Sequence, residues 1–112
     1  MFEIKAIVRL DRRELVINAL HGLADLPGLT VSIVEGVGRR RRHGEAADPP
    51  DFGRITMAKI EIVVTEDRLA EVLATVERAA HTGRHGDGKV FVLKVEQAVR
   101  FRTGESGAAA LR

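Results

Sequence analysis

The chain lacks cysteine, tryptophan and tyrosine altogether, and phenylalanine occurs only four times among its 112 residues. Without cysteine it forms no disulfide and performs no thiol chemistry, which fits the cytoplasm. So few aromatic rings leave few platforms on which the bases of single-stranded nucleic acid could stack. No apolar run approaches the roughly 20 residues that a membrane span needs, and the alternating start at Phe2 is unlike a signal peptide. We therefore expect a cytoplasmic protein without membrane insertion.

Net charge is also small, because 18 basic and 16 acidic side chains leave a formal charge of +2. This excess is too small to indicate binding to nucleic acid. The basic residues are nevertheless clustered, with four consecutive arginines at residues 39–42. We favour a solvated loop over a nucleic-acid site, because neither a groove-reading helix nor an aromatic platform accompanies the cluster. The length and a hydrophobic content of 45% indicate one domain, residues 1–112.

Alternating apolar residues predict four strands, around residues 2–9, 29–38, 58–64 and 90–95. Apolar stripes at helical spacing predict a helix after the first strand and another after the third. The stripes are Leu15, Val16, Ala19, Leu20 and Leu23, then Leu69, Val72, Leu73, Val76 and Ala80. This order predicts an α+β, ferredoxin-like βαββαβ sandwich with an antiparallel sheet and two helices on one face.

A sheet with both helices on one face leaves its other face open to solvent. That face would carry apolar residues such as Ile7, Val63 and Phe91. A chain this small has nothing further with which to cover it, so we expect the protein to oligomerise through its sheets.

A long polar segment, residues 38–55, separates the second and third predicted strands. It contains prolines and glycines, and its apolar residues follow no period. Loops of this length in a compact domain are usually functional, although a disordered insertion is the alternative. Residues 103–112 form a tail that shows no strong secondary-structure signal.

The segment Thr82–Lys89 concentrates glycine and positive charge between the second helix and the fourth strand. Gly83, Gly86 and Gly88 allow positive φ, and successive exposed N–H groups in such a turn make a concave anion site. Lys89 adds a charge at the end of the turn. This is not a P-loop, because Val90 stands where a serine or threonine would hold magnesium and a helix precedes the turn. A glycine-rich turn without a ligand remains the alternative.

Further along, residues 99–102 alternate apolar and basic side chains, which predicts a short strand. Arg100 and Arg102 would then share one face of that strand. A glycine turn, a lysine and two arginines on one face suit a polyphosphate, so our first hypothesis from the residues alone is a nucleotide or similar anion.

Other chemistry has weak support in the sequence. The histidines His43, His81 and His85 lack the spacing and cysteine partners of a zinc site, so we predict no metal centre. Asp87 has no nucleophile or second carboxylate spaced to work with it, so we predict no enzyme activity.

Several motifs together resemble the PII signal-transduction (nitrogen regulatory protein P-II) family, over nearly the whole chain except the long loop. Its C-terminal signature is matched by Thr82-Gly83-x-x-Gly86-Asp87-Gly88-Lys89-Val90-Phe91-Val92 and by Val99-Arg100-x-Arg102-Thr103-Gly104-Glu105. Its central strands are matched by Lys59-Ile60-Glu61-Ile62-Val63-Val64 and by Gly28-x-Thr30-Val31 through Gly36-x-Gly38-Arg39.

This resemblance implies a regulator rather than an enzyme: a homotrimer that binds ATP or ADP, with AMP as a further candidate, in three clefts between subunits. Residues 38–55 correspond to the family's T-loop, which docks on transporters, enzymes or transcription regulators, and residues 82–88 to its B-loop. The implied partner-binding residues are Arg40, Arg41, Arg42, His43, Asp48, Asp51 and Phe52.

The resemblance also assigns roles within the nucleotide cleft, residue by residue. Thr30 and Val63 would contact the base, and Gly36, Gly38 and Arg39 would line the base of the T-loop. The phosphates would be cradled by Gly86, Asp87, Gly88 and Lys89, and reached by Arg100 and Arg102 from the basic strand of the cleft between protomers.

The sequence departs from the family pattern at residues that serve uridylylation and 2-oxoglutarate sensing. No tyrosine is present for uridylylation, and Arg40 replaces a glutamine that helps to hold magnesium and 2-oxoglutarate. A guanidinium has no lone pair for a cation. A family lysine that meets 2-oxoglutarate falls at Met57. We therefore expect neither magnesium-dependent 2-oxoglutarate sensing nor uridylylation. The alternatives are a PII-like branch that responds to another small anion such as bicarbonate, a metal-responsive relative, or a scaffold that no longer senses.

Overall fold

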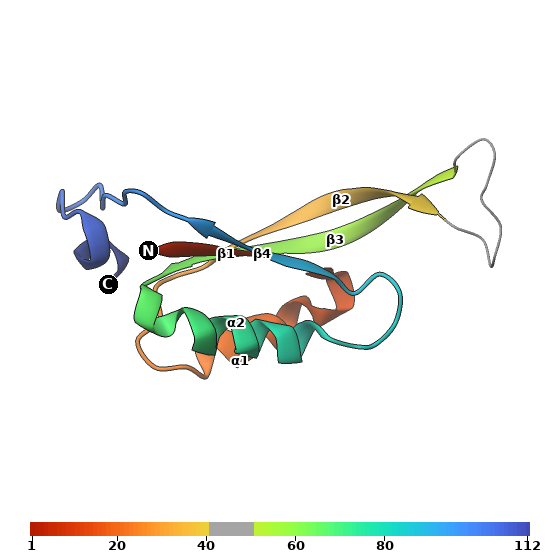
Figure 1. The fold of residues 1–112 in the computed structure, drawn as a ribbon, viewed down its shortest axis with the longest axis horizontal. Helices are drawn as coiled ribbons and strands as arrows, with labels where there is room; N and C mark the ends of the chain where they lie inside the picture. The colour runs from red at the N-terminus through yellow and green to blue at the C-terminus, as the bar shows by residue number, and fades with distance from the viewer. Residues whose placement is uncertain (41–50) are drawn as a thin grey trace.

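The computed structural model describes residues 1–40 and 51–112, with the backbone alone at 39, 40, 51 and 52. It shows two layers, a four-stranded sheet and two helices that cover one of its faces (Figure 1). The elements in chain order are β1 (Phe2–Arg9), α1 (Arg13–His21), β2 (Thr30–Arg40), β3 (Asp51–Val64), α2 (Glu66–Ala80) and β4 (Gly88–Lys94). The strand order is β2-β3-β1-β4, and each neighbouring pair is antiparallel. The predicted ferredoxin-like βαββαβ fold is confirmed.

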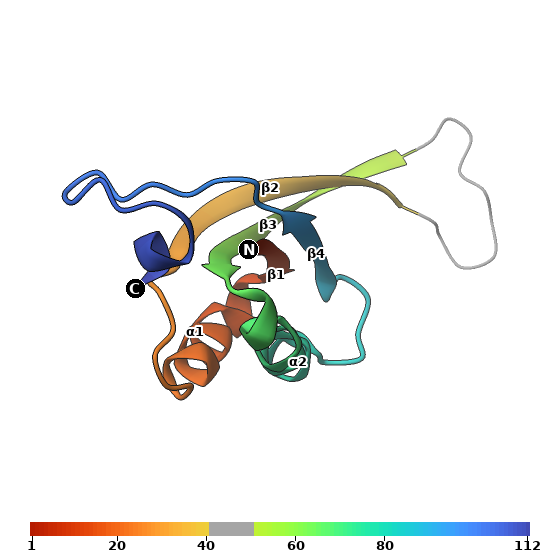
Figure 2. The same cartoon turned by 60° about the vertical axis from the view of Figure 1, so that its left-hand side comes forward.

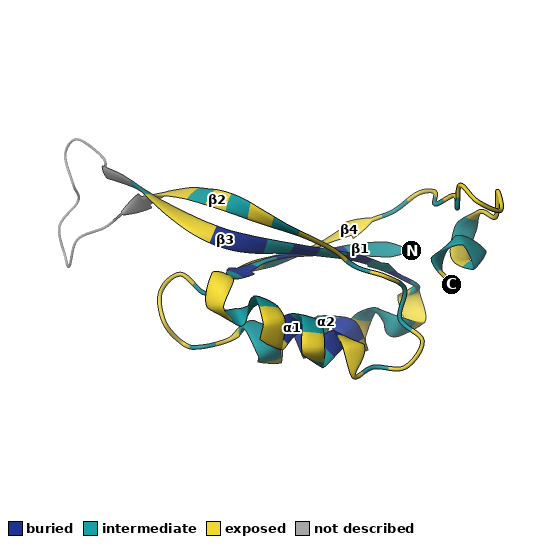
Figure 3. Ribbon diagram, turned by 180° about the vertical axis from the view of Figure 1, so that it is seen from behind, coloured by how far each residue is buried: buried dark blue, intermediate teal, exposed yellow. Residues whose placement is uncertain are grey.

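The core lies between the sheet and the two helices because β1 and β3 alternate apolar and polar residues. Their inward side chains pack against one stripe from each helix. The buried segments of the strands and of both helices are dark blue in Figure 3. The fully buried cluster comprises Ile4, Ala6, Val8, Val16, Leu20, Ala58, Ile60, Ile62, Val64, Val72 and Val76. The predicted stripe of α1 is too wide. Leu15 is 49% exposed at the edge of the stripe, and Leu23 lies beyond the end of the helix.

β2 and β3 continue as a two-stranded ribbon after β1 has ended. β1 pairs with β3 only as far as Arg9↔Met57, whereas β2 and β3 stay paired to Arg40↔Asp51 (Figures 1 and 2). The sequence predicted an irregular segment from residue 38 to 55, and both of its ends are in fact strand. A paired ladder extends by backbone hydrogen bonds, which polar side chains do not prevent. The predicted partner contacts at Arg41, Arg42, His43 and Asp48 lie outside the described residues.

The predicted short strand at residues 99–102 is wrong. Val99 forms one isolated bridge with Ser106, and a reverse turn lies between them. In this turn the Arg100 N–H donates to the Glu105 carbonyl at 2.8 Å, and the Gly104 N–H donates to the Arg100 carbonyl at 2.8 Å. Gly104 supplies the positive φ of 73°, so its turn chemistry outweighs a short alternation of side chains. The tail then ends in a 3-10 helix at Gly107–Leu111.

The sheet face opposite the helices carries charge as well as apolar side chains. Ile7 and Val63 are half-buried there and Phe91 is exposed, as expected. Between them, Lys59 Nζ lies 3.4 Å from Glu61 Oε1. Glu61 also shares a hydrogen bond with Glu3, which raises the pKa of Glu3, while the pKa of Glu61 is lowered by that bond and by Lys59. In the described part of the chain, no helix is long and apolar enough to cross a membrane.

Candidate functional site

The glycine turn, Thr82–Lys89, connects the end of α2 to the start of β4 as predicted. Gly83, Gly86 and Gly88 all have positive φ, at 84°, 91° and 95°. At Gly88 a Cβ would lie 1.8 Å from the carbonyl oxygen of Ile7. No side chain fits at such a distance, so glycine is required there and the turn lies directly against β1.

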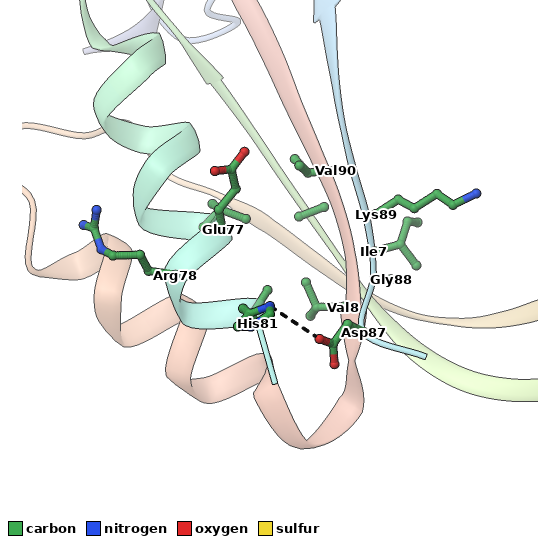
Figure 4. A pocket seen from close by; sticks show the side chains of 12 residues that line it. Ile7, Val8, Glu77, Arg78, His81, Asp87, Gly88, Lys89 and Val90 are labelled. Atoms are coloured by element: carbon green, nitrogen blue, oxygen red, sulfur yellow. Dashed lines mark ion pairs between the residues drawn. The ribbon is translucent and has the colours of Figure 1, made fainter. Parts of the chain in front are cut away.

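Asp87 closes this turn from within. Its Oδ2 accepts the N–H of Thr82 at 2.8 Å and that of Gly83 at 2.9 Å, and its Oδ1 accepts the Thr82 hydroxyl. His81 Nδ1 lies 3.8 Å from the same carboxylate (Figure 4). The Thr82 hydroxyl bond, the two backbone bonds and the His81 charge together lower the pKa of Asp87 to about 2. The family resemblance implies that Asp87 helps to cradle phosphates. In the structure its carboxylate is used by Thr82 and Gly83 within the turn, which leaves its backbone N–H as the group that could serve a phosphate.

The backbone of the turn retains donors for an anion. Among the described residues, no hydrogen bond uses the N–H groups of His85, Gly86 or Asp87. Lys89 follows them on β4, paired with Ile7. Its side chain extends away from α2, while Glu77 and His81 lie on the helix side (Figure 4). Backbone N–H groups without an internal partner, next to a lysine that points away from the helices, can bind a negatively charged group.

The structure brings Gly36 to this turn. A Cβ built at Gly36 would lie 3.4 Å from the Ile55 side chain, and one built at Gly86 would lie 3.9 Å from it. A Cβ at Gly36 would also lie 3.5 Å from the Met57 side chain, and one at Gly88 would lie 3.3 Å from it. Ile55 and Met57 therefore lie between the turn and the base of the ribbon. Gly38, paired with Gly53, lies one step further along the ribbon.

A second group of predicted residues lies elsewhere. Thr30, Val63 and Arg100 line one pocket of about 530 Å³, together with Glu61 and the C-terminal residue Arg112. Arg100 is held there by the Glu105 carboxylate at 3.8 Å and by the Ala110 carbonyl at 3.5 Å.

The two groups occupy opposite ends of the sheet (Figures 1 and 2). The glycine turn precedes β4, whereas Arg100 and Arg102 follow its other end. The seven residues of β4 alone span roughly 20 Å. One chain therefore does not bring Lys89 to the two arginines, and a complete site would need a second copy.

Sequence reasoning missed two features beside the glycine turn. The Arg9 guanidinium reaches the turn, with Nη1 3.2 Å from the His85 carbonyl oxygen. A pocket of about 640 Å³ also opens between α2 and β4 (Figure 4), and its lining includes the apolar residues Val76, Ala80 and Val90. The only hint of this contact in the sequence was that Arg9 is a charged residue at the end of the first alternating strand.

The protein-family model described as Nitrogen regulatory protein P-II matches residues 1–105. The chain belongs to the PII family. The P-II 2 protein of Methanothermobacter thermautotrophicus is 43% identical over 114 residues, covering 99% of this chain and 97% of that relative. The P-II protein of Azospirillum brasilense is 41% identical over 113 residues, covering 99% and 100%.

Solved PII structures share the fold as well. The ATP complex of Bacillus subtilis GlnK superposes with a TM-score of 0.84 at 31% identity, covering 98% of this chain and 96% of that one. Arabidopsis thaliana PII bound to citrate gives a TM-score of 0.78 at 37% identity, covering 97% and 90%. The resemblance drawn from the sequence motifs is confirmed.

The Asp87 contacts predict an acid transition confined to the glycine turn. A carboxylate whose folded pKa lies at about 2, below its ordinary 3.8, stabilises the turn fully above about pH 4 and loses that effect as the pH falls to about 2. The amide proton shifts of Thr82 and Gly83 should follow this titration by NMR. In Asp87→Asn the same two amides should show no transition in that window, and a wild-type midpoint near 3.8 would contradict the assignment.

Proposed function

We propose that this PII-family protein is a regulator that binds ATP or ADP in clefts shared between copies and acts on a partner protein through residues 38–55. The proposal is supported by family membership and by the likeness to Bacillus subtilis GlnK, which was solved as an ATP complex. It gives the protein a binding function and no catalytic step. Among the described residues, no group of acidic and histidine side chains could hold a metal ion.

The observation that carries the proposal is the division of the site between the two ends of the sheet. One end offers the free amides of Gly86 and Asp87 with Lys89, which suit phosphates. The other offers a pocket with Thr30, Val63 and Arg100, which has room for a base. Placing one end of a copy against the other end of the next copy unites the two halves.

Such a contact joins different surfaces of the two copies, so it repeats until a ring closes. We propose that three copies close the ring, as a homotrimer with three clefts.

Positive charge from both copies would surround the polyphosphate. Lys89 and the backbone of the glycine turn come from one copy, with Gly36, Gly38 and Arg39 at the base of its ribbon. Arg100 and Arg102 come from the neighbour. Arginine suits this position because its planar guanidinium binds phosphate oxygens in pairs.

The ribbon links this cleft to the partner. β2 and β3 lead from the glycine turn outward to residues 41–50 without a break in their pairing. A ligand at the base of the ribbon can favour one arrangement of the loop over another. We propose that nucleotide state is passed in this way to a transporter or an enzyme in the cytoplasm, a location that the cysteine-free composition fits.

We propose that 2-oxoglutarate with magnesium is not the effector of this protein. Met57 is only 5% exposed and packs between Gly36 and Gly88. Its thioether cannot pair with a carboxylate as a lysine would. Arg40 likewise offers no lone pair to magnesium. The alternative effector is another small anion, such as bicarbonate.

Calorimetry on the wild-type protein and single variants tests the nucleotide proposal. We expect ATP and ADP to bind, and Lys89→Ala or Arg102→Ala to weaken ATP about tenfold to hundredfold, because each removes a charge-assisted hydrogen bond to phosphate. The affinity for AMP should fall less in these two variants than the affinity for ATP. Lys94→Ala and Arg13→Ala each remove one positive charge at a position outside both groups and should bind like wild type.

If no adenine nucleotide binds to the wild-type chain, the sensing proposal fails and a constitutive scaffold is favoured. Variants at Lys89 and Arg102 that bind ATP like wild type would show that the ligand lies elsewhere. Light scattering after size exclusion checks the assembly, and a monomer would remove the shared cleft.

A separate titration tests the effector. Adding 2-oxoglutarate to the protein saturated with Mg-ATP should give little further heat, because neither Arg40 nor Met57 can take the role of the family residue it replaces. Tight binding that requires magnesium would contradict this expectation.

A further inference from the structure

The last residue of β1, Arg9, lies beside the glycine turn although 76 residues separate it from His85 in the chain. It pairs with Met57 across the sheet, and Met57 is the residue that packs against Gly36 and Gly88. Arg9 therefore projects from the rigid sheet at the place where the turn and the base of the ribbon meet.

The guanidinium of Arg9 is held on two sides. Nη1 donates to the His85 carbonyl at 3.2 Å, and Nε donates to Asp11 Oδ1 at 3.3 Å. The other oxygen of Asp11 lies 3.9 Å from Arg84 Nη2, which belongs to the turn itself. The side chain of Arg9 is only 21% exposed. A planar group fixed by two partners on opposite sides has little freedom to rotate.

This contact bears on the donors of the turn through the geometry of the peptide bond. The His85 carbonyl and the Gly86 N–H belong to one planar trans peptide and point in opposite directions. A cation that fixes the carbonyl consequently aims the N–H of Gly86 away from Arg9. An ideal Cβ at Gly86 would lie 3.6 Å from Nη1, so the guanidinium sits directly against this peptide.

The same cation also polarises the peptide. Positive charge at a carbonyl oxygen draws electron density from the N–H, which becomes a stronger donor to an anion. The Gly86 N–H has no partner among the described residues. It is therefore both oriented and strengthened before any ligand arrives.

We propose that Arg9 is a positioning residue of the phosphate site, which acts through the His85–Gly86 peptide and is braced by Asp11 and Arg84. This inference rests on the proposed nucleotide function and deepens it, because it adds a residue that prepares the cradle without belonging to the glycine turn. We expect Arg9 to matter more for ligands with two or three phosphates, such as ADP and ATP, than for AMP.

The test compares Arg9→Met, which keeps much of the length and loses the donor, with Arg9→Lys, which restores a charged donor. By calorimetry Arg9→Met should weaken ATP about tenfold, the effect of losing one hydrogen bond to a charged group. AMP should be affected less, and Arg9→Lys should recover most of the ATP affinity. Arg13→Ala is the matched control, because Arg13 is an exposed arginine whose ion pair is with its neighbour Glu14.

Salt separates positioning from simple attraction. Raising NaCl from about 0.05 M to 0.5 M screens an exposed charge strongly, so a purely electrostatic Arg9 would lose its advantage over methionine. Positioning predicts that the ratio of affinities between wild type and Arg9→Met persists at the higher salt. A ratio that falls to one would overturn the proposal.

NMR of the ligand-free protein distinguishes a failure of this inference from a failure of the nucleotide function. Arg9→Met should shift the amide signals of Gly86 and Asp87, Arg9→Lys should largely restore them, and the amide signal of Gly22 at the end of α1 should not move in either variant. If the signals shift as expected but wild type binds no nucleotide, the positioning holds and the nucleotide function fails. If the signals do not move, Arg9 does not position the turn.

Discussion

The close approach of Gly88 to the carbonyl of Ile7 is the constraint on which the rest of the site depends. Because a Cβ there would lie 1.8 Å from that oxygen, the chain can leave α2 and enter β4 by this route only with glycine. The approach fixes the turn against β1, within reach of Arg9. Asp87 then closes the turn through the N–H groups of Thr82 and Gly83, so the backbone donors are held by the sheet at one end and by the turn's own hydrogen bonds.

The sheet that fixes the glycine turn also separates it from the other half of the site. β4 runs between them as a rigid edge strand, and Arg100 is anchored at its far end by Glu105 and Ala110. Neither half can reach the other within one chain. The proposed regulator consequently depends on assembly, and its proposed nucleotide cleft would form only between copies.

The sequence predicted the parts of the fold that local patterns encode. Alternation along β1 and β3 located the buried strands, and the spacing of Gly83, Gly86 and Gly88 located the turn. The extension of the ribbon was missed because polar strands paired only to each other need no apolar alternation. The strand at 99–102 was wrong because a turn at Gly104 outweighed four alternating residues. The place of Arg9 follows from a contact across 76 residues, which no local pattern carries. The inward role of Asp87 follows from the conformation of the turn, which brings its carboxylate back to the N–H groups of Thr82 and Gly83.

Mixing subunits measures most directly whether the cleft is shared. Chains carrying Lys89→Ala and chains carrying Arg102→Ala, each with its own tag, would be refolded together and the mixed assemblies purified through both tags. In a ring, one interface of every mixed trimer joins an intact Lys89 to an intact Arg102, so we expect about one high-affinity ATP site per mixed trimer and none in either parent. Mixed trimers that bind ATP no better than their parents would contradict a site built from two copies.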